Sequence, residues 1–176
     1  MPMRLISIIV FLSSFSWVLS QEHKPLTKKE VKFVNSIFQE GSTAEAILLP
    51  DQDNAFAESL MVGDRLYLLK QQDVVLGYLL STRAMGRYDY FDYLLAYAPD
   101  FSVLGLTIVV YRSSHGAAIC QKKWLSQFES YAGEELTLGK EIDAVAGATI
   151  SATSMVRDTK RCYQLMISLK EEGLIN

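Results

Sequence analysis

Apolar residues recur every three to four positions in three segments of the chain, which is the spacing of one face of an α-helix. The first segment follows the capping-box pattern Thr27–Glu30 and predicts a helix over residues 28–40. The second predicts a helix over residues 121–132, and the third predicts a helix from about Ser151 to Glu172. On one side of this last helix we expect a row of buried side chains, namely Met155, Cys162, Leu165, Met166 and Leu169.

Between the first two of these segments, the apolar residues form short runs rich in β-branched and aromatic side chains. The runs cover residues 65–70, 74–82, 90–98 and 102–112. Two of the links between them are short and turn-like, which favours antiparallel hairpins over crossover connections. We expect loops at residues 83–89 and 134–148, and a turn at 50–54. The pattern therefore predicts an α+β fold, in which a curved antiparallel sheet packs with a few helices in a single domain.

The first 20 residues have the three-part pattern of a secretory signal peptide. An uncharged apolar run at 5–19 follows Arg4, and small or β-branched residues precede a cut before Gln21. The run is shorter than the ~20 residues that span a bilayer. We divide the chain into a signal peptide (1–20), an N-terminal helix and lead-in (21–59) and a main domain (60–176). The expected location is periplasmic or otherwise extracytoplasmic, and a retained N-terminal membrane anchor is the alternative.

Composition and charge narrow the classes of function. The chain has 176 residues, of which 49% are hydrophobic and 11% aromatic, as in a folded domain rather than a disordered one. Loss of residues 1–20 would remove one of the 17 basic residues, Arg4, and leave 16 basic against 20 acidic residues, a formal charge of −4. A protein with this charge and no basic cluster is not expected to bind nucleic acid.

Cys120 and Cys162 are the two cysteines. Export would permit a disulfide between them, and two free thiols are the alternative. The two histidines, His23 and His115, are far apart in sequence, so the spacing of a zinc site is absent and we expect no metal. The sequence also has no haem-attachment motif and no glycine-rich phosphate loop.

Residues 143–154 carry the strongest chemical pattern. Gly147 and Ala148 form a stretch almost without side chains, which lets a bulky group approach the backbone. Thr149 then presents a hydroxyl, and more hydroxyls follow at the start of the last predicted helix. The free N–H groups and positive dipole at a helix N-terminus suit an anion such as a phosphate. A plain serine- and threonine-rich helix cap after a glycine turn is the simpler interpretation of the same residues.

The segment Asp143-x-x-Ala146-Gly147-Ala148-Thr149-Ile150-Ser151 resembles the flavinylation motif of the FMN-binding domain family. The pattern of that family is Asp-x-x-Ser/Thr-Gly-Ala-Thr/Ser-x-Ser/Thr, and Ala146 stands where it has a hydroxyl residue. The family includes covalently flavinylated subunits of the sodium-pumping quinone reductase and of the Rnf complex, and many small exported domains. The likeness extends, in order and spacing, over roughly residues 60–170, and it identifies 60–176 as an FMN-binding domain.

The resemblance implies that a dedicated flavin transferase joins FMN to Thr149 through a phosphoester. It further implies that Gly147 and Ala148 give the transferase access to this hydroxyl and that Asp143 helps to present the motif. In the same way, Ser151, with the N–H groups around Ile150, would hold the phosphate. Two further segments would lie near a partly exposed isoalloxazine ring, Met85-Gly86 and Ser114-His115-Gly116. Simpler interpretations remain open: Asp143 as a turn cap, His115 as an ordinary loop residue and Trp124 as core.

These residues together predict an exported redox carrier domain rather than a stand-alone enzyme, because the cofactor supplies the redox chemistry. The partners implied are the flavin transferase for maturation and membrane or periplasmic electron-transfer proteins, so that the domain serves a membrane-associated complex. Two alternatives remain at this point. One is a non-covalent FMN- or ligand-binding or sensory module without catalytic activity, and the other is an exported structural domain without flavin.

Overall fold

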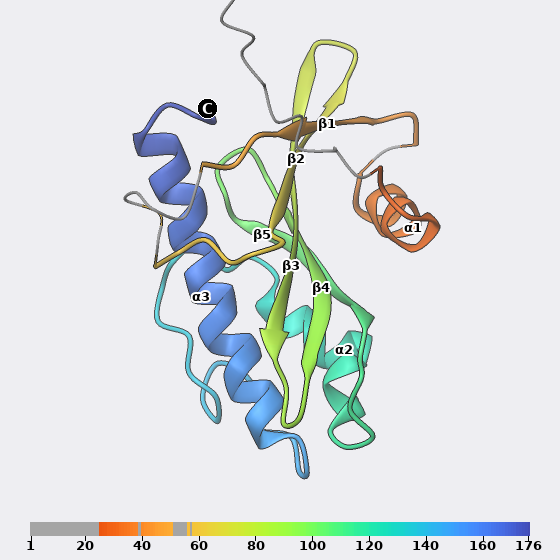
Figure 1. Ribbon diagram of the computed structural model, residues 1–176, viewed down its shortest axis with the longest axis vertical. Helices are drawn as coiled ribbons and strands as arrows, with labels where there is room; N and C mark the ends of the chain where they lie inside the picture. The colour runs from red at the N-terminus through yellow and green to blue at the C-terminus, as the bar shows by residue number, and fades with distance from the viewer. Residues whose placement is uncertain (1–24, 39, 51–55, 57) are drawn as a thin grey trace, which may run out of the picture.

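Five antiparallel strands form a meander at the centre of the described part of the molecule (Figure 1). The computed structural model describes residues 25–38, 40–50, 56 and 58–176, so the predicted signal peptide and most of the turn at 50–54 lie outside the described residues. The strands pair in chain order: β1 (Thr43–Ile47), β2 (Arg65–Gln71), β3 (Val74–Met85), β4 (Tyr90–Tyr97) and β5 (Val103–Val110). The sheet is open, and register shifts in three places mark bulges of the kind that bend a sheet. The α+β class and the antiparallel sheet are therefore confirmed.

The predicted strands match β2 to β5, although β5 ends at Val110, two residues before its predicted end, and two larger differences remain. Strand β1 was not predicted, because its sequence TAEAI is largely exposed and it forms only by pairing with β2. Residues 83–85 were expected in a loop, but they continue β3, where Ala84 is buried and lies opposite Phe91. The loop is therefore shorter, and its turn is closed where the Gly86 N–H donates to the Asp89 carbonyl over 2.9 Å.

Helices cover both faces of the sheet (Figure 1). On one face, α3 (Thr149–Glu171) packs over the main core. The side chains predicted to be buried along it are indeed buried: Met155, Cys162, Leu165, Met166 and Leu169. On the other face, α1 (Lys28–Ile37) covers a smaller core that includes Val34, Phe38, Leu69 and Leu94. The predicted capping box at its start is confirmed.

The helix predicted over residues 121–132 is wrong. The segment instead contains two short turns of helix, α2 (Lys122–Leu125) and η2 (Ser126–Phe128), and a third turn, η1 (Ala117–Cys120), comes just before it. The spacing of the apolar residues nevertheless predicted burial correctly, since Trp124, Phe128 and Tyr131 are all buried. The helix stops because Ser130 takes a positive φ of 68° and its N–H donates to Val103 of β5. The residues after η2 therefore pair with the sheet instead of extending a helix.

The ends of the other two helices also differ from their predicted positions. Helix α1 ends at Ile37 rather than near residue 40, because Phe38 has an extended backbone. Helix α3 begins at Thr149, two residues earlier than predicted, and ends at Glu171. The loop expected at 134–148 is confirmed, apart from one isolated bridge between Leu138 and Ile142.

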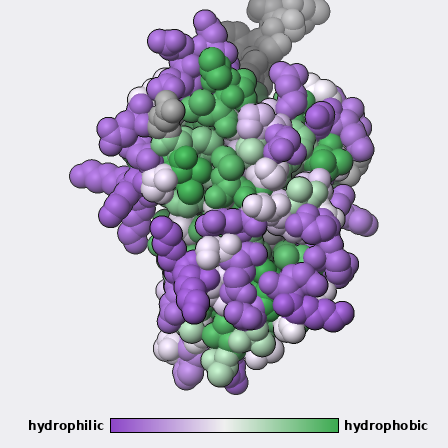
Figure 2. Space-filling view, turned by 180° about the vertical axis from the view of Figure 1, so that it is seen from behind, coloured by the Kyte–Doolittle hydropathy of each residue, from purple (hydrophilic) through white to green (hydrophobic). Residues whose placement is uncertain are grey.

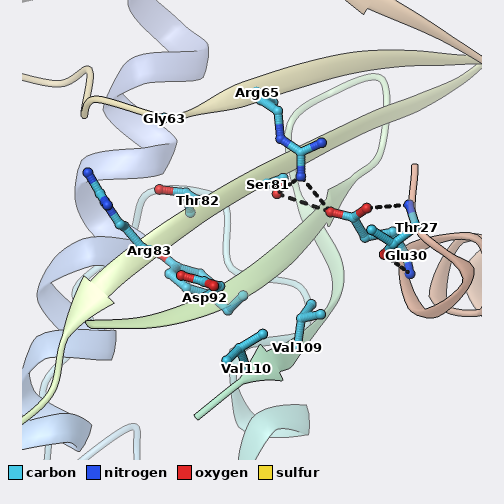
Figure 3. Close-up of a pocket in the computed structure, with 11 residues that line it drawn as sticks. Thr27, Glu30, Gly63, Arg65, Ser81, Thr82, Arg83, Asp92, Val109 and Val110 are labelled. Atoms are coloured by element: carbon cyan, nitrogen blue, oxygen red, sulfur yellow. Dashed lines mark hydrogen bonds and ion pairs between the residues drawn. The ribbon is translucent and has the colours of Figure 1, made fainter. Parts of the chain in front are cut away.

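An ion pair fastens α1 to the sheet (Figure 3). Glu30 is 3% exposed, and one of its carboxylate oxygens accepts a hydrogen bond from Arg65 of β2 over 2.6 Å. Its other oxygen accepts from the Thr27 N–H, which is the reciprocal bond of the capping box. Ser81 of β3 accepts from the same guanidinium. These side chains line a pocket of about 310 Å³ between the helix and the sheet.

A second buried network holds α3 in place. Arg161 pairs with Asp158 on its own helix and with Asp64, which precedes β2. The same guanidinium also donates to Thr82 of β3 and to the Ser59 carbonyl. The middle of α3 is therefore bound to the sheet and to the segment before β2, which fixes the direction in which the helix N-terminus points.

The surface of the protein carries both hydrophilic and hydrophobic side chains (Figure 2). Figure 2 shows hydrophilic side chains spread over the face seen from behind, with hydrophobic ones gathered mainly in its upper half. Among the described residues, no helix is both long enough and apolar enough to cross a bilayer. Both cysteines are free thiols, with Cys120 exposed and Cys162 buried, so the open question of a disulfide is answered in favour of two thiols.

Candidate functional site

Helix α3 starts abruptly at Thr149, after a turn made by Gly147. Gly147 has a φ of +72°, in the left-handed region that favours glycine, and no atom lies within 4 Å of the position of an added Cβ. Ala148 is the residue before the helix, and no side chain within the described residues caps it there. The first N–H groups of the helix therefore have no acceptor in the helix itself and point outward with the positive end of the dipole.

A shallow pocket of about 190 Å³ lies over this helix end. Three segments that are far apart in sequence line it: the loop between β3 and β4, the loop after β5 and the start of α3. The lining residues are Arg87, His115, Gly147, Ala148, Thr149, Ile150 and Ser151. All but Arg87 are residues that the sequence predicted for the site. Thr149 is exposed to solvent as a residue.

Ser151 joins the helix start to the loop after β5. Its side chain is buried, with 2% exposed, and its hydroxyl lies 3.0 Å from the hydroxyl of Tyr111. The Tyr111 hydroxyl donates its single proton to the His115 carbonyl over 2.8 Å, so the Ser151 hydroxyl is the donor in the bond between them. The proton of Ser151 is thus engaged inside the protein, and the predicted contact between this hydroxyl and a phosphate stays a prediction.

Two glycines allow this close assembly. A Cβ on Gly116 would lie 2.8 Å from the Tyr111 hydroxyl and 3.2 Å from the Cβ of Ala148. A Cβ on Gly86 would lie 2.8 Å from the Asp89 carbonyl oxygen and 3.5 Å from the Ser151 hydroxyl. Both predicted glycines therefore lie against the helix start. Met85 is half-exposed at the end of β3 and does not line the pocket.

Asp143 lies outside the pocket, but its backbone is held firmly. The indole N–H of Trp124 donates to the Asp143 carbonyl over 2.8 Å, and the Asp143 N–H donates to the side chain of Gln127 over 2.9 Å. Trp124 is itself buried and packs edge-on against Phe128. The structure thus gives Trp124 a place in the core, and it leaves the carboxyl group of Asp143 at the surface.

Comparison with known proteins adds a likeness of fold. No family model matches the chain, and no curated protein matches it significantly. The fold resembles that of Shewanella oneidensis NqrC. The crystal structure of that protein superposes with a TM-score of 0.51, over 77% of this chain and 82% of the other, at 12% sequence identity. At this identity the likeness establishes a shared fold and nothing finer.

Two residues of the site escaped the sequence analysis. Arg87 lies in the loop between β3 and β4, and nothing in the local sequence shows that this loop reaches the start of α3. Tyr111 lies in a segment that carried the family resemblance, but no role was assigned to it. Its position four residues before His115 is the signal that could have indicated a contact to that loop.

The pocket suits the phosphate end of FMN better than the whole molecule. Its volume of about 190 Å³ is below the ~300–1,000 Å³ of pockets that enclose a drug-sized ligand. It combines a helix N-terminus with a guanidinium and an imidazole, and no carboxylate is among its lining residues. These groups fit an anion, and an isoalloxazine ring would extend beyond them to the surface.

Proposed function

We propose that this protein is an exported flavoprotein that carries FMN on Thr149 through a phosphoester and transfers electrons outside the cytoplasm. The observation that carries the proposal is exposed Thr149 at the N-terminus of α3, which has no side-chain cap, in a pocket with Arg87 and His115. The flavin supplies the redox chemistry. The protein supplies the attachment point, the groups that hold the phosphate and the orientation of the ring.

The residues around Thr149 have separate tasks in this proposal. The threonine oxygen forms the new bond to phosphorus as the pyrophosphate bond of a flavin dinucleotide breaks, AMP leaves and the hydroxyl proton passes to the transferase. Gly147 and Ala148 keep the approach to this oxygen clear, because neither carries a side chain beyond a methyl group. The backbone N–H groups at the start of α3 stabilise the phosphate through their charge and direction.

The shape of the pocket favours covalent over non-covalent binding. A non-covalent site gains affinity by burying most of its ligand, and this pocket is too shallow to bury a flavin ring. A phosphoester retains the flavin without such burial. The exposed ring that results is suited to electron exchange with a second protein.

The likeness to NqrC agrees with the resemblance drawn from the sequence, because the FMN-binding domain family includes flavin-carrying subunits of the sodium-pumping quinone reductase. We therefore propose electron-transfer proteins at or near a membrane as the partners, and a flavin transferase as the maturation enzyme. In this proposal the domain is a carrier within a longer electron path and works outside the cytoplasm.

Co-production with a flavin transferase tests the proposal. The denatured protein should fluoresce as a flavin on a gel, and its intact mass should rise by one FMN minus one water. Thr149→Ala should abolish both signals, whereas Thr153→Ala, which removes an exposed hydroxyl one turn further along α3, should keep them. The same mass spectrum shows whether residues 1–20 have been removed.

Two outcomes would count against the proposal. Wild-type protein without added mass, in a host that flavinylates another substrate, would refute flavin attachment. Flavin that co-purifies but leaves on denaturation would favour the non-covalent binding module instead.

A further inference from the structure

Arg87 is placed at the pocket by the tight turn between β3 and β4. The Gly86 N–H donates to the Asp89 carbonyl, which closes the turn and holds Arg87 at its tip. The guanidinium lies 5.1 Å from the centre of the Tyr88 ring, in a cation–π contact. Arg87 is also one of the residues that line the pocket, as Thr149 is. The hairpin thus brings a positive charge to the helix end from a distant part of the sequence.

The charge of Arg87 is not neutralised within the described residues. Of the six arginines in the described part of the chain, three have carboxylate partners within 4.0 Å: Arg65 pairs with Glu30, Arg112 with Asp92, and Arg161 with both Asp64 and Asp158. Arg87 has no such partner in the described part of the chain, although Asp89 is only two residues away. No acidic residue lines the pocket either. The pocket is therefore an electropositive site that lacks a built-in anion.

We propose that Arg87 is the counter-charge of the phosphodiester on Thr149, and this inference rests on the proposed function. A phosphodiester carries one negative charge and two free oxygens, and a guanidinium fork can donate to both of them at once. Arg87 thus acts as a positioning residue. It holds the phosphate between the hairpin and the N-terminus of α3, and thereby sets the direction in which the flavin projects from the pocket.

Thermal unfolding of the full chain, with and without attached flavin, tests this role. The rise in Tm on flavinylation should be largest in the wild type, smaller in Arg87→Gln and intermediate in Arg87→Lys, because lysine keeps the charge but lacks the fork. Arg157→Gln removes an exposed arginine of α3 that does not line the pocket, and it should behave as the wild type. The difference between wild type and Arg87→Gln should shrink in 1 M salt, where the screening length falls to ~3 Å.

The ³¹P resonance of the attached phosphodiester gives a second readout that general stability does not move. It should shift in Arg87→Gln and stay unchanged in Arg157→Gln. If Arg87→Gln cannot be flavinylated, inorganic phosphate takes the place of the ester. Its effect on the amide resonances of Thr149 and Ile150 should then be several-fold weaker in the variant than in the unflavinylated wild type.

The outcomes separate this inference from the proposed function. Wild-type protein that never gains flavin mass would refute the proposed function. Wild-type and Arg87→Gln proteins that carry flavin, with the same rise in Tm and the same ³¹P resonance, would overturn the role of Arg87 alone. Equal responses to inorganic phosphate in the two proteins would overturn it as well.

Discussion

Replacement of Tyr111 by phenylalanine should weaken the contact between the start of α3 and the loop after β5. The Tyr111 hydroxyl links Ser151 of α3 to the His115 carbonyl, and the ring itself packs against Phe91. Tyr111→Phe keeps the ring and deletes both hydrogen bonds. His115 is exposed, so water can replace the bond to its carbonyl. Ser151 is only 2% exposed as a residue, and its hydroxyl would lose its partner inside the protein.

The size of the effect follows from this difference in exposure. An unsatisfied buried polar group costs ~1–3 kcal/mol, whereas a hydrogen bond that water can replace contributes ~0.5–1.5 kcal/mol at most. We therefore expect Tyr111→Phe to lower the free energy of unfolding by about 2 kcal/mol, most of it from Ser151. Tyr88→Phe is the matched control. Its side chain is 67% exposed, and its loss of a hydroxyl should change stability by less than ~0.5 kcal/mol.

Urea unfolding at neutral pH measures both variants. The midpoint should fall for Tyr111→Phe with little change in the slope, because the surface exposed on unfolding is nearly the same. Amide exchange should also speed up in the loop of residues 113–116, and under the proposed function the flavinylation of Thr149 should slow down. Equal stability of Tyr111→Phe and Tyr88→Phe, or unchanged exchange in the loop, would refute the reasoning.

Two further predictions concern buried groups away from the site. Burial alone would raise the pKa of Glu30, but the hydrogen bonds from Thr27 and the charge of Arg65 lower it below its ordinary value of 4.5. The ion pair therefore stabilises the fold above that pH, and its contribution is lost as pH falls through the lowered pKa. Glu30→Gln should lower the free energy of unfolding at pH 7, measured by chemical unfolding, by about 1–3 kcal/mol. The difference in stability between the variant and the wild type should disappear in acid. A difference that persists in acid would contradict the role of the ion pair. A thiol reagent should modify exposed Cys120 in the native protein and react with Cys162 only after unfolding, because burial shields Cys162 and raises its pKa. Equal reaction rates of the two thiols in the native protein would contradict this prediction.

The sequence predicted those parts of the fold that local patterns determine. The capping box at Thr27 and the apolar side of α3 were correct because side chains three or four residues apart decide them. The helix at 121–132 was wrong because a contact distant in sequence, between Ser130 and Val103, ends it. Strand β1 has little apolar pattern and depends on its neighbour for its backbone hydrogen bonds.

The same distinction applies to the site. Residues 147–151 form a local motif, and the structure places all of them at one pocket as their sequence suggested. His115 and Gly116 were tied to the motif through a family resemblance, and they lie against it. Arg87 could not be found in this way, because its distance from Thr149 depends on the length of the β3–β4 hairpin and on the docking of α3. The role of Tyr111 could not be predicted either, because it depends on the path that the chain takes after β5.

The pocket needs segments from the middle and from the end of the chain, so it cannot form before α3 has docked on the sheet. Each strand of the meander pairs with its neighbour in sequence, so the sheet can assemble from contacts that close quickly. Helix α3 comes last and must dock across strands made much earlier. Only that docking brings Thr149 beside Arg87 and His115. The pocket therefore exists only when α3 is docked on the sheet, and a modifying enzyme that requires it would label folded molecules and pass over incomplete ones.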